Sequence, residues 1–367
     1  MSGKKHGIIF KIFKTIFCLI LVVIVAAVGM IGFLSFTEYK PDDRENVEVT
    51  GESMRRLRLD REISLLTFNI GYGALGDNAD FFMDGGESVT TADENRVNQN
   101  LNGILGNIKE IDPDILLVQE IDKSSSRSYK INEYEKFKNE LTKYAFSFAN
   151  NFKVAFLPYP VPPIGKVDSG IATGSVFGAT SAERVQLPIP FSWPMRMANL
   201  KRCVLISRIP VEKSDKELVI FNLHLEAYDS GEGKIAQTNM LAELLKDETE
   251  KGNYVIAGGD FNQIFSNADK NAYEVKEGMW APGEIDVEAF GEGFDFLMDE
   301  SVPSCRSLDK AYKDADKKAF QYYLIDGFIV SDNIEVKELK TQDLGFKDSD
   351  HNPVLLKAVL KGEQTDE

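Results

Sequence analysis

Cysteine is scarce in this chain, and histidine is equally scarce, with three of each in 367 residues. Cys18 lies in an apolar run, which leaves Cys203 and Cys305, too few for a disulfide framework. A single Cys203–Cys305 bridge stays open for an extracytoplasmic domain, although Cys203 has the setting of a buried apolar residue in a strand. No Cys/His cluster of the kind that holds structural zinc is present. With 43% hydrophobic residues, the chain must instead depend on one large core, or two modest ones.

Basic charge is also in short supply. Residues 1–40 hold five Lys and one Glu, so of the 42 basic and 58 acidic residues, 37 and 57 belong to 41–367, a formal charge of −20. A body with this charge repels polyanions at long range, which disfavours non-specific binding of duplex DNA. A local basic groove stays open, and its candidate residues are Lys166, Arg184, Arg196, Lys201 and Arg202.

The N-terminus contains the one long apolar run. Residues 15–36 carry no charge over 22 positions, enough for a helix to cross a hydrocarbon core of about 30 Å. A cleaved signal peptide and a buried core helix are the alternatives. The length of the run and the absence of a convincing Ala-x-Ala site favour an uncleaved transmembrane helix. Lysines precede it, so residues 1–14 are expected to form a short basic cytoplasmic tail, and everything after Glu38 is expected outside the cell membrane.

Beyond the span, residues 37–61 are polar and predict a stalk, 62–361 a catalytic domain, and 362–367 a tail. One helix signal begins at an N-cap at Thr91 or Asp93 and is stopped by Pro113, and two more cover 132–142 and 233–248. Strand patterns are more numerous, and residues 144–156 are expected to form two strands with a turn at Asn150-Asn151. Many strands with few helices between them predict stacked sheets flanked by helices in one domain.

Polar residues repeatedly stand where an apolar strand ends. The clearest case is Tyr254-Val-Ile-Ala257, where Gly258-Gly259 end the strand and Asp260 and Asn262 follow. Residues two apart on an extended chain project to the same side, so these two side chains are suited to activating water and stabilising an oxyanion. The full set in such positions is Asn69, Glu120, His224, Asp260, Asn262, Asp326, Asp350 and His351.

The segments around these residues resemble, in order, those of the endonuclease/exonuclease/phosphatase superfamily. This group includes deoxyribonuclease I, apurinic endonucleases, neutral sphingomyelinases and inositol-phosphate phosphatases. The matching segments, over about 62–361, are Phe68-Asn69, Gln119-Glu120, Asn222-Leu-His224, Gly259-Asp-Phe-Asn262, Ile325-Asp-Gly-Phe-Ile-Val330 and Ser349-Asp-His-Asn-Pro353. The resemblance implies a four-layer α/β sandwich, in which two packed mixed β-sheets carry helices on their outer faces.

The resemblance also implies roles for the eight residues at a site that binds a divalent metal and hydrolyses phosphoesters. Glu120 resembles the principal metal ligand, with Asn69 and Asp350 assisting, and oxygen ligands suit Mg²⁺, with Mn²⁺ as an alternative. Asp260 would orient or deprotonate water, and Asn262 would stabilise the phosphorane-like oxygens. His351, aligned by Asp326, would act as acid/base or charge stabiliser at the phosphate, and His224 would donate to a non-bridging or leaving oxygen.

Two departures bear on the subfamily. Many nuclease members have a tyrosine directly before the Ser-Gly of the middle strand, where this chain has Asp168-Ser169-Gly170, and Tyr159 is one candidate replacement. The stretch Tyr322–Gly327 lacks the Pro-Ala-Trp-Cys-Asp-Arg pattern of the inositol-phosphatase branch. Loops 156–164 and 187–197 are rich in aromatic residues and proline, and they would either contact a lipid interface or pack on each other.

Together these features predict a membrane-anchored, extracytoplasmic, Mg²⁺-dependent phosphoesterase that acts as a monomer on a phosphodiester, such as a lipid headgroup or another small phosphoester. A nuclease acting on extracellular nucleic acid is the second interpretation. A catalytically inactive protein that uses the fold for surface binding is the third, and the retention of Glu120, Asp260, Asn262, Asp326 and His351 together counts against it.

Overall fold

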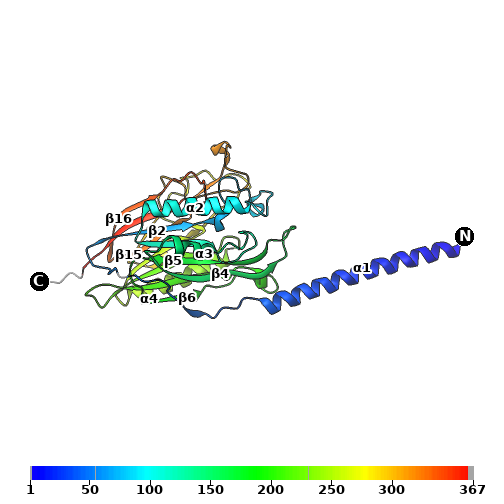
Figure 1. Cartoon of the computed structure of the whole chain (residues 1–367), viewed down its shortest axis with the longest axis horizontal. Helices are drawn as coiled ribbons and strands as arrows, with labels where there is room; N and C mark the ends of the chain where they lie inside the picture. Colours follow the sequence, from blue (N-terminus) through cyan, green and yellow to red (C-terminus); the bar gives the residue numbers. More distant parts are fainter. Residues whose placement is uncertain (1, 54, 230, 363–367) are drawn as a thin grey trace.

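Two β-sheets packed face to face form the body of the protein in the computed structural model, which describes residues 2–53, 55–229 and 231–362 (Figure 1). The six-stranded sheet has the order β16 (Ile334–Thr341), β17 (Val354–Leu360), β2 (Glu62–Asn69), β3 (Ile115–Asp122), β5 (Gly165–Ser175), β4 (Ala145–Leu157). The seven-stranded sheet has the order β1 (Arg44–Val47), β6 (Ser181–Gln186), β7 (Cys203–Pro210), β8 (Glu217–His224), β9 (Tyr254–Asp260), β15 (Asp326–Ser331), β12 (Phe294–Leu297). Both sheets are mixed, because β2–β3 and β8–β9 are parallel and their other pairs are antiparallel.

Short elements complete the domain within the described residues. Two small ribbons pair β10 (Gln263–Phe265) with β11 (Gly283–Ile285), and β13 (Cys305–Arg306) with β14 (Tyr322–Tyr323). The single-turn 3₁₀ helices are η1 (Gly71–Gly73), η2 (Phe82–Asp84), η3 (Met195–Ala198), η4 (Val287–Phe290) and η5 (Lys317–Ala319). The 263–320 insertion is therefore built mostly from turns and two- to four-residue strands.

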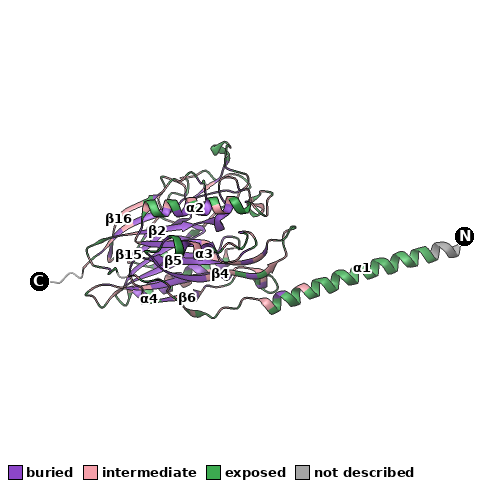
Figure 2. Ribbon diagram, viewed as in Figure 1, coloured by how far each residue is buried: buried purple, intermediate pink, exposed green. Residues whose placement is uncertain are grey.

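Helices cover the outer faces of the sheets, and the buried residues lie between the layers (Figure 2). Helix α2 (Glu94–Ile111) begins at Asp93, whose carboxylate accepts from the Arg96 N–H, and it buries an apolar stripe from Val97 to Ile108. Helix α4 (Glu232–Thr249) buries Leu241 and Leu245 in the core of the seven-stranded sheet. With α3 (Glu133–Glu140) beside β3, this arrangement is the predicted four-layer sandwich.

The pair of strands expected over 144–156 is a single strand. β4 runs for 13 residues and pairs with β5 along its length, with a bulge between Asn150 and Phe152. The Asn150 amide donates to the carboxylate of Asp168 and to the carbonyl of Ser169, both on β5. An Asn-Asn pair suits a turn or a bulge equally well, and the long partner strand decides for the bulge.

The segment 37–61 is not a free stalk. β1 adds to the edge of the seven-stranded sheet by pairing with β6, and Thr50 bridges to Phe146. Leu57 is buried in the core and bridges to Val211. The prediction from polar composition was wrong because edge pairing satisfies the backbone of a polar segment without a hydrophobic pattern.

Helix α1 (Ser2–Thr37) continues through both the expected basic tail and the expected span, and it projects away from the domain (Figure 1). From Gly7 to Thr37 it is long and apolar enough to cross a membrane. Cys203 and Cys305 are both free and buried, so they do not form the bridge that the sequence left open. Residues 363–367 of the expected tail lie outside the described part of the chain.

Candidate active site

The ends of strands from both sheets build the candidate site. Asp260 ends β9, and its backbone is paired with His224 at the end of β8 on one side and with Asp326 at the start of β15 on the other. In the other sheet, Asn69 at the end of β2 is paired with Gln119 on β3. Because the two sheets pack together, the polar residues at these strand ends meet at one edge.

Gly259 allows β8 and β9 to approach closely just before the site. A Cβ atom at Gly259 would lie 2.0 Å from the Leu223 carbonyl oxygen, and the residue has φ +153°. No other amino acid fits without moving one strand, because every other side chain begins with that atom. The glycine therefore sets the spacing between His224 and Asp260.

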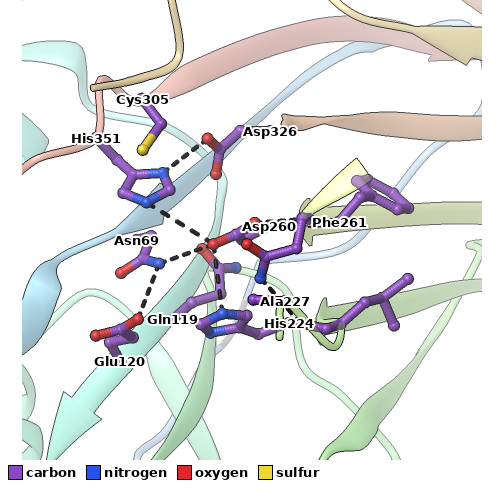
Figure 3. A network of polar contacts seen from close by, with 12 residues as sticks. Asn69, Gln119, Glu120, His224, Ala227, Asp260, Phe261, Cys305, Asp326 and His351 are labelled. Atoms are coloured by element: carbon purple, nitrogen blue, oxygen red, sulfur yellow. Dashed lines mark hydrogen bonds and ion pairs between the residues drawn. The ribbon is translucent and has the colours of Figure 1, made fainter. Parts of the chain in front are cut away.

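Asp260 is the centre of the polar network in Figure 3. Its side chain is 2% exposed, and its Oδ2 lies 3.0 Å from Asn69 Nδ2, 3.4 Å from His224 Nε2 and 3.8 Å from His351 Nε2. Its Oδ1 accepts from the Asn262 backbone N–H at 2.9 Å. Burial and the neighbouring Asp326 raise the pKa of the Asp260 carboxyl, and His351 opposes that rise. Asp260 is thus a buried carboxylate whose two oxygens face side chains and backbone of the protein.

His351 is held by a second carboxylate. Its Nδ1 lies 2.8 Å from Asp326 Oδ2, and both side chains are buried. Burial alone would lower the pKa of His351, but the Asp326 carboxylate outweighs it and raises this pKa well above the ordinary value. The ring is therefore protonated at neutral pH, with Nε2–H turned toward Asp260 (Figure 3).

His224 has the opposite electrostatic setting. Burial, followed by the positive charges of Arg202 and His351, lowers the pKa of His224 well below its ordinary value. Its Nδ1 is buried and has no hydrogen-bond partner among the described residues, while Nε2 faces Asp260. Asp260 therefore lies between one neutral and one charged imidazole.

The remaining carboxylates lie on the Asn69 side. Asn69 Nδ2 is 3.4 Å from Glu120 Oε1, and its Oδ1 accepts from the Gly71 N–H. Glu120 has φ +55° within the bulge of β3, between Val118 and Ile121, which turns its carboxylate out of the sheet register. Burial, reinforced by the charge of Glu120, raises the pKa of Asp350 to about 6. The half-buried Glu120 and the buried Asp350 are thus two acidic side chains whose charges interact.

Asn262 is placed differently from a free oxyanion donor. Its Nδ2 donates to the Leu225 carbonyl at 2.9 Å, and its own φ is +51°. One of its two amide hydrogens is therefore used to hold the turn after β9, and the second remains for a ligand. The eight residues expected to converge, from Asn69 to His351, do so.

A family model described as the "Endonuclease/Exonuclease/phosphatase family" matches residues 66–309, which include the ends of β2, β3, β8 and β9. This chain belongs to the endonuclease/exonuclease/phosphatase family. Members are metal-dependent hydrolases of phosphoester bonds, and this protein is an enzyme of that class. No curated protein sequence matches the chain.

Solved structures share the fold at low sequence identity. The crystal structure of an endonuclease/exonuclease/phosphatase from Beutenbergia cavernae is 16% identical, with 83% of this chain and 72% of that chain covered and a TM-score of 0.57. The corresponding protein from Bacteroides vulgatus is 14% identical, with 82% and 100% covered and a TM-score of 0.51. ANGEL2, described as a 2′,3′-cyclic phosphatase, is 13% identical, with 87% and 99% covered and a TM-score of 0.51. These likenesses establish the architecture and leave the substrate open.

The donors present fit the divalent metal of this family. Glu120 and Asp350 would supply carboxylate oxygens, and a bound cation would relieve the repulsion between these two negative charges. Within the described residues, Asp260, Asp326 and His351 form one further compact group, and Cys305, Asp350 and His351 form another. Asn69 presents Nδ2 to Glu120, so it would have to turn its amide to become an oxygen ligand.

Arg127 belongs to the site environment and was missed in the sequence. Its guanidinium lies 3.6 Å from the centre of the Tyr72 ring and is held by Asp122 and by the hydroxyl of Ser169. Its charge also acts on His224 and Glu120. Arg127 does not end a strand, so the rule that found the other residues does not apply to it.

Tyr159, the candidate replacement for the family tyrosine, is in a different place. It is largely exposed, and its ring lies 6.1 Å from that of Phe82. The Ser169 hydroxyl instead accepts a hydrogen bond from Arg127, so a cation lies beside Ser169-Gly170 of β5.

Proposed function

We propose that this protein is a membrane-anchored, extracytoplasmic, Mg²⁺-dependent phosphodiesterase, whose substrate is a lipid headgroup or another small phosphodiester. The observation that supports it best is the setting of Asp260, which lies between the neutral His224 and the protonated His351. A carboxylate can accept a proton from water and an imidazolium can donate one to a leaving oxygen, so the pair is suited to general acid–base hydrolysis of a phosphodiester.

In this proposal Asp260 orients water and takes its proton, since its oxygens are buried and its pKa is raised toward neutrality by burial. His351 donates through Nε2 to a phosphate oxygen, and Asp326 keeps it charged and oriented. His224 donates as a neutral imidazole, and the free amide hydrogen of Asn262 adds a further donor. A bound divalent ion, held by Glu120 and Asp350 with Asn69 assisting, would neutralise charge on the phosphoryl group.

The basic residues weigh against the nuclease alternative. All five candidates for a nucleic-acid groove are engaged within the protein. Arg184 donates to the carbonyls of Asn150 and Lys201, and Lys201 and Arg196 both pair with Glu38. Arg202 is buried against the His224 carbonyl and Glu226. Lys166 donates to the Ser124 hydroxyl. Little positive charge is left to hold a polyanion against the formal −20 of residues 41–367.

The membrane topology in the proposal rests on α1. Its uncharged run begins at Thr15 and is preceded by Lys4, Lys5, Lys11 and Lys14, which supports a cytoplasmic N-terminus and a domain outside the cell membrane. Protease treatment of intact cells tests this placement, and a catalytic domain that stays protected would reverse it.

Activity is tested with the full-length chain in phosphatidylcholine vesicles and bis-p-nitrophenyl phosphate in the surrounding buffer. We expect hydrolysis with Mg²⁺, none with EDTA, and a fall of about 10²- to 10⁴-fold in His351→Ala. Val275→Ser, which changes an exposed residue of the insertion, is the control and should be fully active. Wild-type turnover equal to that of His351→Ala would support the inactive binding protein instead. DNA cleavage that falls steeply with salt would support the nuclease.

A further inference from the structure

One loop next to α1 exposes large apolar side chains. Residues 188–195, Pro-Ile-Pro-Phe-Ser-Trp-Pro-Met, are called here the apolar loop. Trp193 is 58% exposed and Met195 is 64% exposed, and Ile189 is also exposed. Exposed side chains of this size, grouped in one loop, indicate a surface that meets another apolar phase.

The residues that directly follow the apolar loop contact the last turn of α1. The hydroxyl of Ser35 donates to Met197 Sδ at 3.0 Å, and Leu34 is buried against the domain. Just beyond the helix, Glu38 is paired with Lys201 at 3.4 Å and with Arg196 at 3.6 Å. Glu38 and Lys201 are both buried, so the helix end is fixed to the segment that carries the loop.

This attachment sets the depth of the loop. Ser35 and Phe36 are the last residues of the uncharged run, which begins at Thr15, and 22 residues at 1.5 Å each span about 33 Å. A side chain that touches Ser35 therefore stands at the level where the apolar run meets the outer headgroup layer. Met195 and Trp193 precede Met197 by two and four residues, at most about 7 Å and 14 Å of extended chain, so the headgroup layer is within their reach.

A second exposed apolar element lies on the same side of the domain. The hairpin of β4 and β5 projects toward the side from which α1 leaves (Figure 1), and near its tip Tyr159 is 70% exposed and Val161 is 91% exposed. The Tyr159 ring packs against Phe82 of η2. The same short helix carries Asp84, a carboxyl that interacts electrostatically with Asp350 and Glu120. The apolar tip is thereby connected to the rim of the site.

We propose that the apolar loop and the β4–β5 tip dock on the outer leaflet of the bilayer that α1 crosses, so that the site takes phosphodiesters of membrane lipids. The occupant of this surface is the lipid bilayer, because the surface continues from a membrane-spanning helix. This inference rests on the proposed function for the chemistry at the site, whereas the docking itself does not depend on catalysis. Since Arg196 and Lys201 are already paired with Glu38, apolar insertion and not charge holds the surface, and salt should leave docking unchanged.

The two tryptophans of the chain make docking measurable. Trp280→Phe leaves Trp193 as the only reporter, and Trp193→Phe leaves Trp280, whose Nε1 donates to the Ala227 carbonyl beside Tyr323. Both full-length variants are placed in vesicles of phosphatidylcholine with brominated acyl chains, because bromine quenches a tryptophan only at short range. We expect quenching of Trp193, unchanged by salt, and none of Trp280. Equal emission of Trp193 in brominated and plain vesicles would overturn the proposal.

Two chromogenic diesters then separate docking from catalysis. The variant Trp193→Ser with Met195→Ser should hydrolyse vesicle-bound hexadecyl p-nitrophenyl phosphate about tenfold more slowly, the size expected for losing apolar insertion. It should hydrolyse soluble bis-p-nitrophenyl phosphate at the wild-type rate, and Val275→Ser should alter neither. Equal loss on both diesters, or on neither, overturns the lipid-facing role. Quenching of Trp193 without any hydrolysis by the wild type would reject the proposed function and retain the docking surface.

Discussion

Replacing Asp326 by Asn should move the whole pH–rate profile to lower pH. In the wild type, the Asp326 carboxylate lies 2.8 Å from His351 Nδ1, and it raises the pKa of His351 well above its ordinary value. The same negative charge helps burial to raise the pKa of Asp260. Asp326→Asn keeps the shape and removes the charge, so both pKa values should fall.

The size of the shift follows from the geometry. A hydrogen bond to a charged group contributes about 1.5–3 kcal/mol, and one pKa unit corresponds to about 1.4 kcal/mol. The pKa of His351 should therefore fall by about 1–2 units. Because His351 must be protonated to donate, the alkaline limb moves to lower pH. Because Asp260 must be ionised to accept a proton, the acidic limb also moves to lower pH.

The measurement is kcat/KM for bis-p-nitrophenyl phosphate as a function of pH, with the full-length chain in phosphatidylcholine vesicles and saturating Mg²⁺. Asp332→Asn is the matched control, because this exposed carboxylate follows the other end of β15. It should reproduce the wild-type profile. An alkaline limb that stays in place in Asp326→Asn, with unchanged kcat/KM at neutral pH, would refute the assignment of His351 as a charged donor aligned by Asp326.

Three further substitutions test the metal, the strand spacing and a remote ion pair. Glu120→Gln should raise the Mg²⁺ concentration needed for half-maximal activity by at least about tenfold, measured by metal titration, and an unchanged titration would reject Glu120 as a ligand. Gly259→Ala should destabilise the protein by about 2–4 kcal/mol in thermal unfolding and lower kcat, because the Cβ of the new alanine would meet the Leu223 carbonyl. Gly106→Ala, on the open face of α2, is the control and should be neutral or stabilising in the same experiment. Glu248→Gln should lower stability at pH 7 by about 1–3 kcal/mol without changing kcat, because it removes one of the two carboxylates that pair with Arg208 and leaves only Glu217. Burial would raise the pKa of Glu248, but hydrogen bonds from Arg208, Lys251 and Asn253 outweigh it and lower this pKa from about 4.5 to about 2. The contribution of Glu248 to stability is therefore complete above about pH 4.5 and is lost as the pH falls toward 2. A stability difference between wild type and variant that grows on acidification would contradict this account.

The sequence predicted the packed two-sheet architecture, and it also pointed to residues that the structure brings together at one edge. Asn69, Glu120, His224, Asp260, Asp326 and His351 were visible in the sequence because a polar residue at the end of an apolar strand is conspicuous. Arg127 was not, since it lies in a loop and reaches the site by stacking on Tyr72. The stalk was misjudged for a related reason, because pairing of β1 with an open sheet edge needs no apolar pattern.

The chain's local pattern by itself determined where most strands of the two sheets lie, which polar residues stand at their ends, and that a long uncharged run precedes them, because these properties depend on neighbours in the sequence. Only the tertiary structure decided that His224 is neutral and His351 is charged. Burial lowers the pKa of both imidazoles, and the charge of Arg202 lowers that of His224 further, whereas the Asp326 carboxylate outweighs burial and raises that of His351. The place of Trp193 was decided in the same way, since contacts of Met197 and Lys201 with the end of α1 bring its loop to the level where that helix would leave a membrane.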